Sequence, residues 1–298
     1  LTLYGGSLWQ PLGIVIISGL CISALSSFLL VPILLFTSKK QPIKPEYNWQ
    51  LIIFDVGQGL SILIKQHKNA ILYDTGASFE SGFNMAEAVV LPFLQYEGIH
   101  SLDKVFISHG DNDHAGGLKL IQQSIDIKQL IYSKESTSLA KHCIQGNVDY
   151  WYGLKIEVLW PKKAVSKEND DSCVLLISDG SHHVLLTGDI SKKIEQQLLE
   201  QYPHLQADVL IVPHHGSKTS SSKKFIAHVN PKIAVVSAGF LNRWKMPVIG
   251  VVNRYQKQNI KLFNGAETGQ IMLNFSKHGI EQYTYRENLW PFWFANSF

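Results

Sequence analysis

The sequence predicts an α/β protein, a layered αββα sandwich preceded by one transmembrane helix. From residue 51 onward, short apolar or alternating runs are broken by glycine, which is typical of strands, and helical patterns are interspersed among them. Sheets that need helices on one face and each other on the opposite face stack as such layers. Polar clusters fall where the predicted strands end, which is where a rigid scaffold presents reactive groups.

The elements follow one another in short units. Strands are predicted over 51–57, 61–66, 70–76, 103–109, 127–133, 154–160, 173–179, 183–189, 207–216, 232–238 and 269–275. Helices are predicted over 84–98, from Ala115 onward, over 191–202 and 220–229, and near 249–258. This order places two polar clusters, 108–117 and 213–222, directly after buried strands.

The segment before the first charged residue, Lys39, is almost entirely apolar. About 20 residues suffice to cross a bilayer, so residues 1–38 are predicted to form a transmembrane segment, the last span of a longer polytopic chain. A buried helix or a signal peptide is the alternative, although neither the positively charged N-terminal region nor the cleavage site of a signal peptide is evident. Residues 39–49 form a juxtamembrane linker whose three lysines favour a cytoplasmic position.

A single large domain is predicted over residues 50–280, followed by an aromatic tail over 281–298. The tail either lies at the level of the lipid headgroups or covers the edge of a sheet. A net charge of +3 with 17% charged residues excludes a strongly basic protein, so nucleic-acid binding must depend on a local patch. Three scattered cysteines indicate neither a disulfide framework nor a thiolate zinc site, and Cys173 is expected to be a small buried residue.

The segment SHGDNDHAGG, residues 108–117, concentrates ionisable side chains. His109, Asp111, Asp113 and His114 occupy six consecutive positions at the end of a predicted strand. Alternate residues of an extended loop point to one side, and imidazole with carboxylate suits zinc, manganese or iron. The alternative is a polar loop that caps the next helix. The density of ligands favours a metal site.

Two further clusters support this interpretation. Asp189 ends a strand and can bridge two metal ions, although a Thr-Gly-Asp turn is also an ordinary structural feature. In PHHGSKTSSS, residues 213–222, one of the two adjacent histidines is expected to face the metals. The residues expected to bind phosphate oxygens, unless they only begin a helix, are Lys218, Thr219 and Ser220.

Two aspartates end neighbouring predicted strands and are followed by glycines. Asp55 lies in DVGQG and Asp74 in DTG. We expect both to hydrogen-bond the ligand histidines from behind, and tight turns between strands are the alternative.

Taken together and in this order, FDVGQG, YDTG, SHGDNDHAGG, SCVLLI, LLTGD and VLIVPHHGSKTSS resemble the metallo-β-lactamase superfamily. More narrowly, they resemble the C-terminal domain of the ComEC/Rec2 family of competence DNA channels, over about residues 50–275. The resemblance implies two divalent metal ions, zinc or manganese. Their implied ligands are His109 and Asp111 for the first ion, Asp113 and His114 for the second, Asp189 as the bridge, and His214.

The resemblance also implies a function. The domain would be a metal-dependent nuclease that degrades the DNA strand not imported during natural transformation, with Asp113 orienting the nucleophile and His215 protonating the leaving group. Its partners would be DNA, either single-stranded or as a strand-separated duplex, together with the membrane, other DNA-uptake competence proteins and the N-terminal channel portion of the same chain. The protein would lie in the plasma membrane with this domain on the extracytoplasmic face, against the indication from the linker lysines.

Two positions depart from the family pattern. Leu60 stands where the family has Asp after DVGQG, and Met246 stands where it has a His that binds the second metal. Methionine is a poor ligand for these ions, so the second site is expected to be weak. This leaves two alternatives open: a non-catalytic domain that guides DNA, and another metallohydrolase such as a lactonase or thioesterase.

Overall fold

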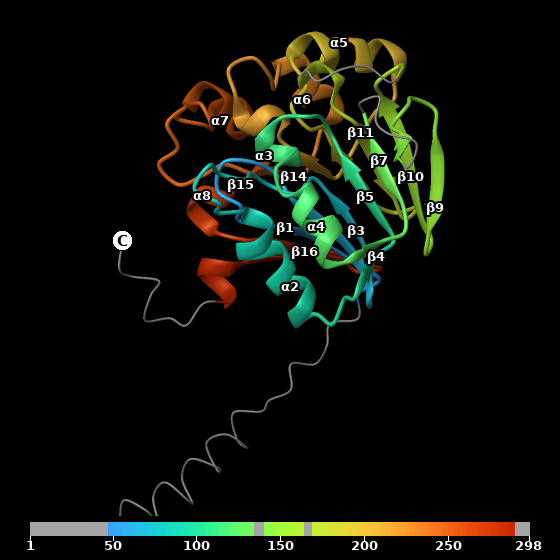
Figure 1. Cartoon of the computed structure of the whole chain (residues 1–298). Helices are drawn as coiled ribbons and strands as arrows, with labels where there is room; N and C mark the ends of the chain where they lie inside the picture. Colours follow the sequence, from blue (N-terminus) through green and yellow to red (C-terminus); the bar gives the residue numbers. More distant parts are fainter. Residues whose placement is uncertain (1–46, 134–139, 164–168, 290–298) are drawn as a thin grey trace, which may run out of the picture. The chain divides into compact units, whose positions relative to one another are not determined.

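The computed structural model describes residues 47–133, 140–163 and 169–289, and within them two mixed sheets face each other (Figure 1). The strands of the first sheet are, in spatial order, β17 (Gly279–Thr284), β16 (Ile271–Ser276), β1 (Trp49–Ile53), β2 (Ile62–Gln66), β3 (Asn69–Tyr73), β5 (Lys104–Ile107), β7 (Leu130–Tyr132) and β8 (Ala140–His142). Those of the second sheet are β15 (Lys261–Asn264), β14 (Ile233–Val236), β13 (Val209–Ile211), β12 (His183–Leu186), β11 (Val174–Ser178), β10 (Leu154–Trp160) and β9 (Val148–Trp151). A small separate pair joins β4 (Ser101–Leu102) to β6 (Asp126–Ile127).

Helices cover the outer face of each sheet. The first sheet is covered by η1 (Ala86–Val90), α2 (Leu91–Tyr96) and α4 (Leu118–Ser124), and the second by α5 (Lys192–Gln201), α6 (Lys223–Val229) and α7 (Ile249–Gln256). Shorter helical turns are α3 (Asn112–Ala115), η2 (Asn169–Asp171), η3 (Pro213–Gly216), α8 (Gly265–Thr268) and η4 (Tyr285–Leu289). The predicted αββα layering is therefore confirmed for this part of the chain.

Strand periodicity explains how the layers hold together. In β1, Leu51 and Ile53 enter the core between the two sheets, while Ile52 points outward and packs with Val90 and Leu94 of the covering helices. Each such side chain contributes about 1.5–3 kcal/mol when it is fully buried. Because β1 is buried on both faces, its sequence WQLII is apolar at nearly every position.

Strand direction explains where the polar clusters meet. β3, β5 and β7 run parallel in the first sheet, and β12, β13, β14 and β15 run parallel in the second. The carboxyl ends of β3 and β5 lead into Asp74 and the 108–117 loop, and those of β12 and β13 lead into Asp189 and the 213–216 turn. Both sheets therefore deliver their polar loops to one edge of the sandwich.

Some elements differ from the sequence prediction. The short strands β8, β9 and β15 were not predicted, and the predicted tail over 281–298 begins inside β17, which pairs with β16. Edge strands with mixed exposure carry little periodic signal, which explains these omissions. The predicted transmembrane segment (1–38) and nearly all of the predicted linker (39–49) lie outside the described residues. Within the described ranges, no helix has both the length and the apolar character needed to cross a bilayer.

Cys173 is buried, as expected, but the expectation that the cysteines form no disulfide was wrong. Cys143, which follows β8, and Cys173, which precedes β11, form a disulfide with their Cα atoms 5.9 Å apart. The bond joins the two sheets, so residues 30 positions apart in sequence become neighbours only in the folded sandwich.

Candidate metal centre

The first element of the site is the support for His114. Asp74 follows β3, is fully buried and has a positive φ of 59°. Its carboxylate accepts hydrogen bonds from the backbone N–H and the hydroxyl of Ser108, both at 2.7 Å, and from Nδ1 of His114, also at 2.7 Å. Because Nδ1–H of His114 is donated to Asp74, Nε2 carries the free lone pair. The predicted supporting role matches this contact.

His215 is held in the same manner from the other sheet. Its Nδ1 lies 2.8 Å from the carbonyl oxygen of Ser237, which can only accept, so Nδ1 is the protonated nitrogen. The turn that carries it is left-handed, with φ of 51° at both His214 and His215. Gly216 follows with φ of 78°, and a Cβ there would lie 2.6 Å from Cβ of Pro247. Glycine at this position lets the turn pack closely enough to aim Nε2 of His215 inward.

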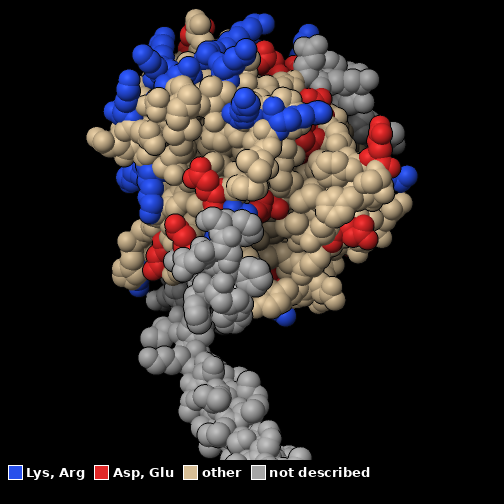
Figure 2. All heavy atoms as spheres, turned by 90° about the vertical axis from the view of Figure 1, so that its left-hand side faces the viewer, with Lys and Arg blue, Asp and Glu red and all other residues tan. Residues whose placement is uncertain are grey.

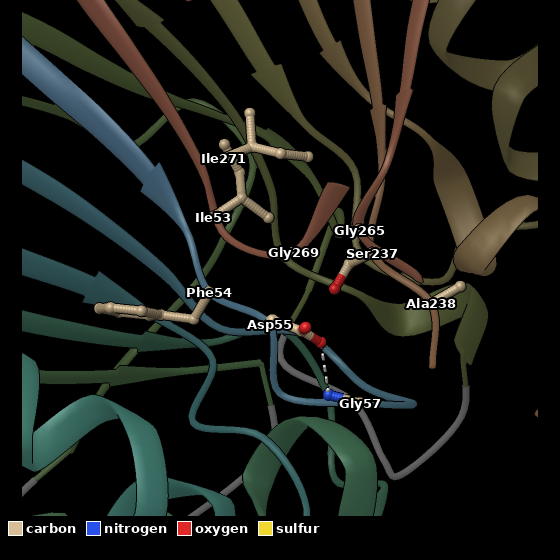
Figure 3. A pocket seen from close by; sticks show the side chains of 9 residues that line it. All are labelled: Ile53, Phe54, Asp55, Gly57, Ser237, Ala238, Gly265, Gly269 and Ile271. Atoms are coloured by element: carbon tan, nitrogen blue, oxygen red, sulfur yellow. Dashed lines mark hydrogen bonds between the residues drawn. The ribbon is translucent and has the colours of Figure 1, made fainter. Parts of the chain in front are cut away.

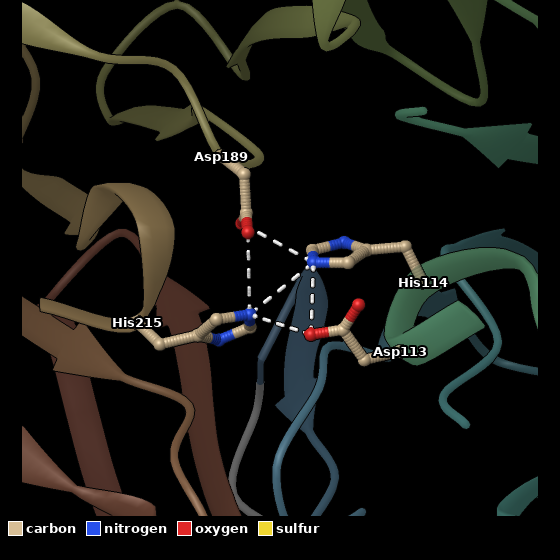
Figure 4. A group of neighbouring side chains, drawn as sticks. All are labelled: Asp113, His114, Asp189 and His215. Carbon is tan, nitrogen blue, oxygen red and sulfur yellow. Dashed lines mark hydrogen bonds and ion pairs between the residues drawn. The ribbon is translucent and has the colours of Figure 1, made fainter. Parts of the chain in front are cut away.

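Four side chains converge on one point (Figure 4). Nε2 of His114 lies 3.2 Å from Nε2 of His215 and 3.2 Å from Oδ1 of Asp189. Nε2 of His215 lies 3.4 Å from Oδ2 of Asp189 and 3.4 Å from Oδ2 of Asp113, and the separation between His114 and Asp113 is 4.0 Å. Two donors bound at about 2.0–2.1 Å to one tetrahedral ion lie about 3.3 Å apart. The four donors therefore have the spacing of the ligands of a single divalent ion.

The charges in this group favour a cation. Burial lowers the pKa of both imidazoles, but the neighbouring carboxylates together outweigh it: Asp189 and Asp74 at His114, and Asp189 and Asp113 at His215. The pKa of His114 therefore lies well above its ordinary value and that of His215 is raised to about 9. Burial likewise raises the pKa of Asp189, but His114 and His215 more than compensate and hold it well below its usual range. The pKa of Asp113 is lowered in the same way, against its burial, by the hydrogen bond from His215. The carboxylates of Asp113 and Asp189 thus attract positive charge to the point where the Nε2 atoms of His114 and His215 converge.

A second group beside it is looser. His109 is fully buried, its Nε2 has no hydrogen-bond partner among the described residues, and this atom lies 3.6 Å from Oδ2 of Asp111. Burial lowers the pKa of His109 to about 4. Nε2 of His214 lies 3.7 Å from Oδ2 of Asp189.

The comparisons agree with this geometry. Residues 54–239 match the family model described as the metallo-β-lactamase superfamily, and this match covers more than half of the chain. The chain belongs to the metallo-β-lactamase superfamily. A solved structure, the diiron β-hydroxylase CmlA from Streptomyces venezuelae, superimposes with a TM-score of 0.51 at 12% identity, covering 78% of this chain and 55% of that one. At that identity the likeness shows the superfamily fold alone.

Curated relatives confirm the narrower resemblance to the ComEC/Rec2 family. The chain is 40% identical over 267 residues to "Recombination protein 2" of Haemophilus influenzae, covering 88% of this chain and 33% of the relative. It is 33% identical over 248 residues to "Competence protein ComA" of Neisseria gonorrhoeae, covering 83% of this chain and 35% of the relative. The chain therefore spans about a third of the length of these competence proteins.

The 108–117 loop and the segment after β12 bring Asp113, His114 and Asp189 together, as the sequence suggested. The histidine that joins them in the four-donor group is His215, whereas Nε2 of His214 lies 3.7 Å from Oδ2 of Asp189. Nδ1 of His215 contacts the carbonyl of Ser237, and its Nε2 points into the four-donor group.

Other predicted site residues lie elsewhere. Asp55 contacts neither ligand histidine in the described structure and faces a narrow pocket lined by Gly57 and Ser237, 3.6 Å from the guanidinium of Arg286 (Figure 3). Ser220 is fully buried, and its hydroxyl donates to the carbonyl of Pro213 at 2.7 Å, so it fixes the turn and does not face substrate.

Lys218 and Thr219 remain exposed beside the site, and the hydroxyl of Thr219 lies 3.3 Å from Nδ1 of His214. The sulfur of Met246 lies outside the four donors, 3.9 Å from Nε2 of Gln58.

Sequence reasoning missed three supporting serines. The hydroxyl of Ser172 accepts from the backbone N–H of Asp189 at 3.0 Å and lies 3.4 Å from Nδ1 of His109. The hydroxyl of Ser108 lies 3.0 Å from the same nitrogen of His109, and the Ser237 carbonyl holds His215. Ser108 directly precedes His109, and Ser172 lies just before the buried strand β11, so their positions give a weak local indication of a supporting role. The position of Ser237 in the sequence gives no such indication.

Proposed function

We propose that this chain is the metal-dependent phosphodiesterase domain of a membrane protein for DNA uptake, and that it hydrolyses DNA. The observation that carries the proposal is the four-donor group of Asp113, His114, Asp189 and His215, assembled from both sheets. Its occurrence in a chain similar to proteins named for competence and recombination supports DNA as the substrate class.

A divalent cation bound there supplies a water of lowered pKa and neutralises charge on a phosphate. Asp113 is about one-third exposed, whereas Asp189 is nearly buried, so Asp113 is the carboxylate able to touch solvent and orient the attacking water. Asp74 and Ser237 fix the two imidazoles by their Nδ1 atoms, which keeps both Nε2 lone pairs directed inward without reorganisation.

A second, weaker cation is proposed at the looser group. His109, Asp111 and His214 would hold it, with Asp189 shared between the two ions. The buried Nε2 of His109 supports this, because a buried nitrogen without a partner is costly unless a ligand satisfies it. Zinc and manganese both suit this mixture of imidazole and carboxylate.

The disulfide supports the proposed position on the extracytoplasmic face. Disulfides persist in oxidising compartments and are rare in the cytosol, and the bond between Cys143 and Cys173 joins two sheets of this domain. The lysines of the linker favour a cytoplasmic position by the positive-inside rule. Charges counted near a single span are weaker evidence for the side of the membrane than a disulfide, which forms and persists in an oxidising compartment.

The test is a nuclease assay on the whole 298-residue chain in detergent, with labelled DNA and added Mn²⁺ or Zn²⁺. Cleavage should appear with either metal and fall by a factor of at least 100 in Asp189→Asn. Small lactone and thioester substrates serve as the second arm, because their hydrolysis without effect on DNA would support another metallohydrolase. Absence of DNA cleavage by the wild type, with metal bound as shown by elemental analysis, would contradict the proposal.

A non-catalytic DNA-guiding domain is the second candidate, favoured by Leu60 and Met246. Leu60 is buried and its backbone N–H donates to the carbonyl of Asp113 at 3.0 Å, so no carboxylate enters the site from this position. DNA binding that is equally tight with and without metal, together with no cleavage, would favour this candidate.

A further inference from the structure

Two loops beside the metal centre expose aromatic side chains to solvent. Loop 239–247 exposes Phe240 (66%) and Trp244 (49%), and loop 78–84 exposes Phe79 (51%) and Phe83 (53%). Large aromatic side chains normally bury most of their surface, so such exposure in these loops indicates an interaction surface.

Both loops are attached to the residues that form the metal centre. Loop 239–247 begins after Ser237, whose carbonyl holds His215, and ends at Val248, whose N–H donates to the carbonyl of Gly216 at 3.0 Å. Loop 78–84 begins at Ser78, whose hydroxyl and carbonyl both bond the side chain of Asn112, at 2.9 and 2.8 Å. Asn112 directly precedes Asp113 in sequence. The two aromatic pairs thus lie on loops that are bonded to residues adjoining the four donors.

Loop 239–247 is rigid despite its exposure. The side chain of Asn242 donates to the carbonyls of Gly239 at 2.8 Å and Met246 at 2.6 Å, and accepts from the N–H of Met246 at 2.9 Å. The N–H of Gly239 donates to the side-chain oxygen of Gln58 at 3.3 Å, which ties the loop to the DVGQG segment. A loop fixed in this way presents its rings at little entropic cost on binding.

The charge around the loop is positive. The guanidinium of Arg243 lies 4.2 Å from the ring centre of Trp244, and Lys245 is exposed next to it. Lys218 follows the histidine turn, and Lys223 begins α6, both exposed. In the view of Figure 2, which faces the α7 side, Lys and Arg side chains gather over the upper part of this face. Aromatic rings interleaved with cations match a phosphate backbone whose bases are free to stack.

We propose that loop 239–247 is a stacking platform for the bases of an unpaired nucleic-acid strand, and that it makes this site prefer single strands to duplex. The proposal deepens the proposed function by naming the form of its substrate. Bases inside a duplex already stack on one another and cannot reach Trp244, whereas an unpaired base can stack on the ring face not covered by Arg243. Phe79 and Phe83, with ring centres 5.8 Å apart, offer a second pair of exposed rings for such contacts.

The test measures binding without catalysis. The whole chain in detergent, with a chelator present, is titrated against a fluorescent 20-nucleotide single strand that does not fold on itself. It is also titrated against a hairpin whose stem pairs these 20 nucleotides with their complement. The wild type should bind the single strand more tightly. Trp244→Ala should weaken single-strand binding by about 5- to 150-fold and leave duplex binding within twofold, while Trp244→Phe should retain most of the affinity.

Tyr150→Ala is the matched control, because Tyr150 is 74% exposed on β9, at the far edge of the second sheet, and should change neither affinity. Equal loss of single-strand and duplex binding in Trp244→Ala, or no loss of either, would overturn the proposal. So would a loss of binding to anionic vesicles without a loss of binding to the single strand, since the loop would then contact membrane.

The two proposals fail separately. Single-strand binding that depends on Trp244 in a chain that never cleaves DNA would sustain the platform and reject the nuclease. Cleavage that depends on Asp189 but shows no preference for single strands, with single-strand binding unchanged in Trp244→Ala, would sustain the nuclease and reject the platform.

Discussion

Removal of the disulfide should lower the stability of this domain by an amount that the structure allows us to work out. The bond between Cys143 and Cys173 closes a loop of 30 residues. In the chain-entropy description, such a loop restricts the unfolded state by about 12 cal/mol/K, or about 3.7 kcal/mol at 25 °C. For a domain of this size, each kcal/mol shifts Tm by about 2–4 °C, so the double change Cys143→Ser/Cys173→Ser should lower Tm by about 7–15 °C.

The assay is thermal unfolding of the whole chain in detergent, followed by circular dichroism, for the oxidised wild type, the reduced wild type and the double variant. The reduced wild type and the double variant should unfold at similar temperatures. Cys21→Ser is the control, because it removes the remaining thiol and should leave Tm unchanged. A change of less than about 2 °C in the double variant would refute the reasoning, as would full resistance of the wild-type thiols to oxidation.

Three further predictions concern the site and its surroundings. Asp74→Asn keeps the shape but weakens the support of His114, so metal affinity should fall about 10- to 100-fold in calorimetric titrations, and an unchanged affinity would count against the support role. Free metal at about 100 times its Kd stabilises the folded wild type by about 2.7 kcal/mol, so removing that metal with a chelator should lower the wild-type Tm by about 5–11 °C. The same chelator should leave the Tm of Asp189→Asn unchanged. Glu195→Ala leaves two backbone N–H groups before α6 without their acceptor and should cost about 2–4 kcal/mol in urea unfolding, whereas Glu200→Ala on the exposed side of α5 should cost less than about 0.5 kcal/mol.

Much of the site could be predicted from the sequence because its chemistry is concentrated at strand ends. Asp113 and His114 are adjacent in sequence, and Asp189 follows an apolar strand, so their position required only the direction of the parallel strands. Asp74 was predictable for the same reason, since it ends the strand next to the one that leads into the 108–117 loop.

The choice between His214 and His215 could not be made locally. An extended strand would alternate the two rings, but both residues adopt left-handed φ, because the turn is packed against Pro247 from a loop more than 30 residues away. The pairing of Cys143 with Cys173 depends in the same way on how two sheets meet. Long-range packing, which no local pattern encodes, decided both.

Diffraction from crystals grown with Mn²⁺, recorded to reveal anomalous scattering, tests the central claim most directly. The account predicts a peak within about 2.0–2.3 Å of Nε2 of His114, Nε2 of His215 and one oxygen each of Asp113 and Asp189. A peak bound by His214 in place of His215, or no peak between these four side chains at saturating metal, would contradict it.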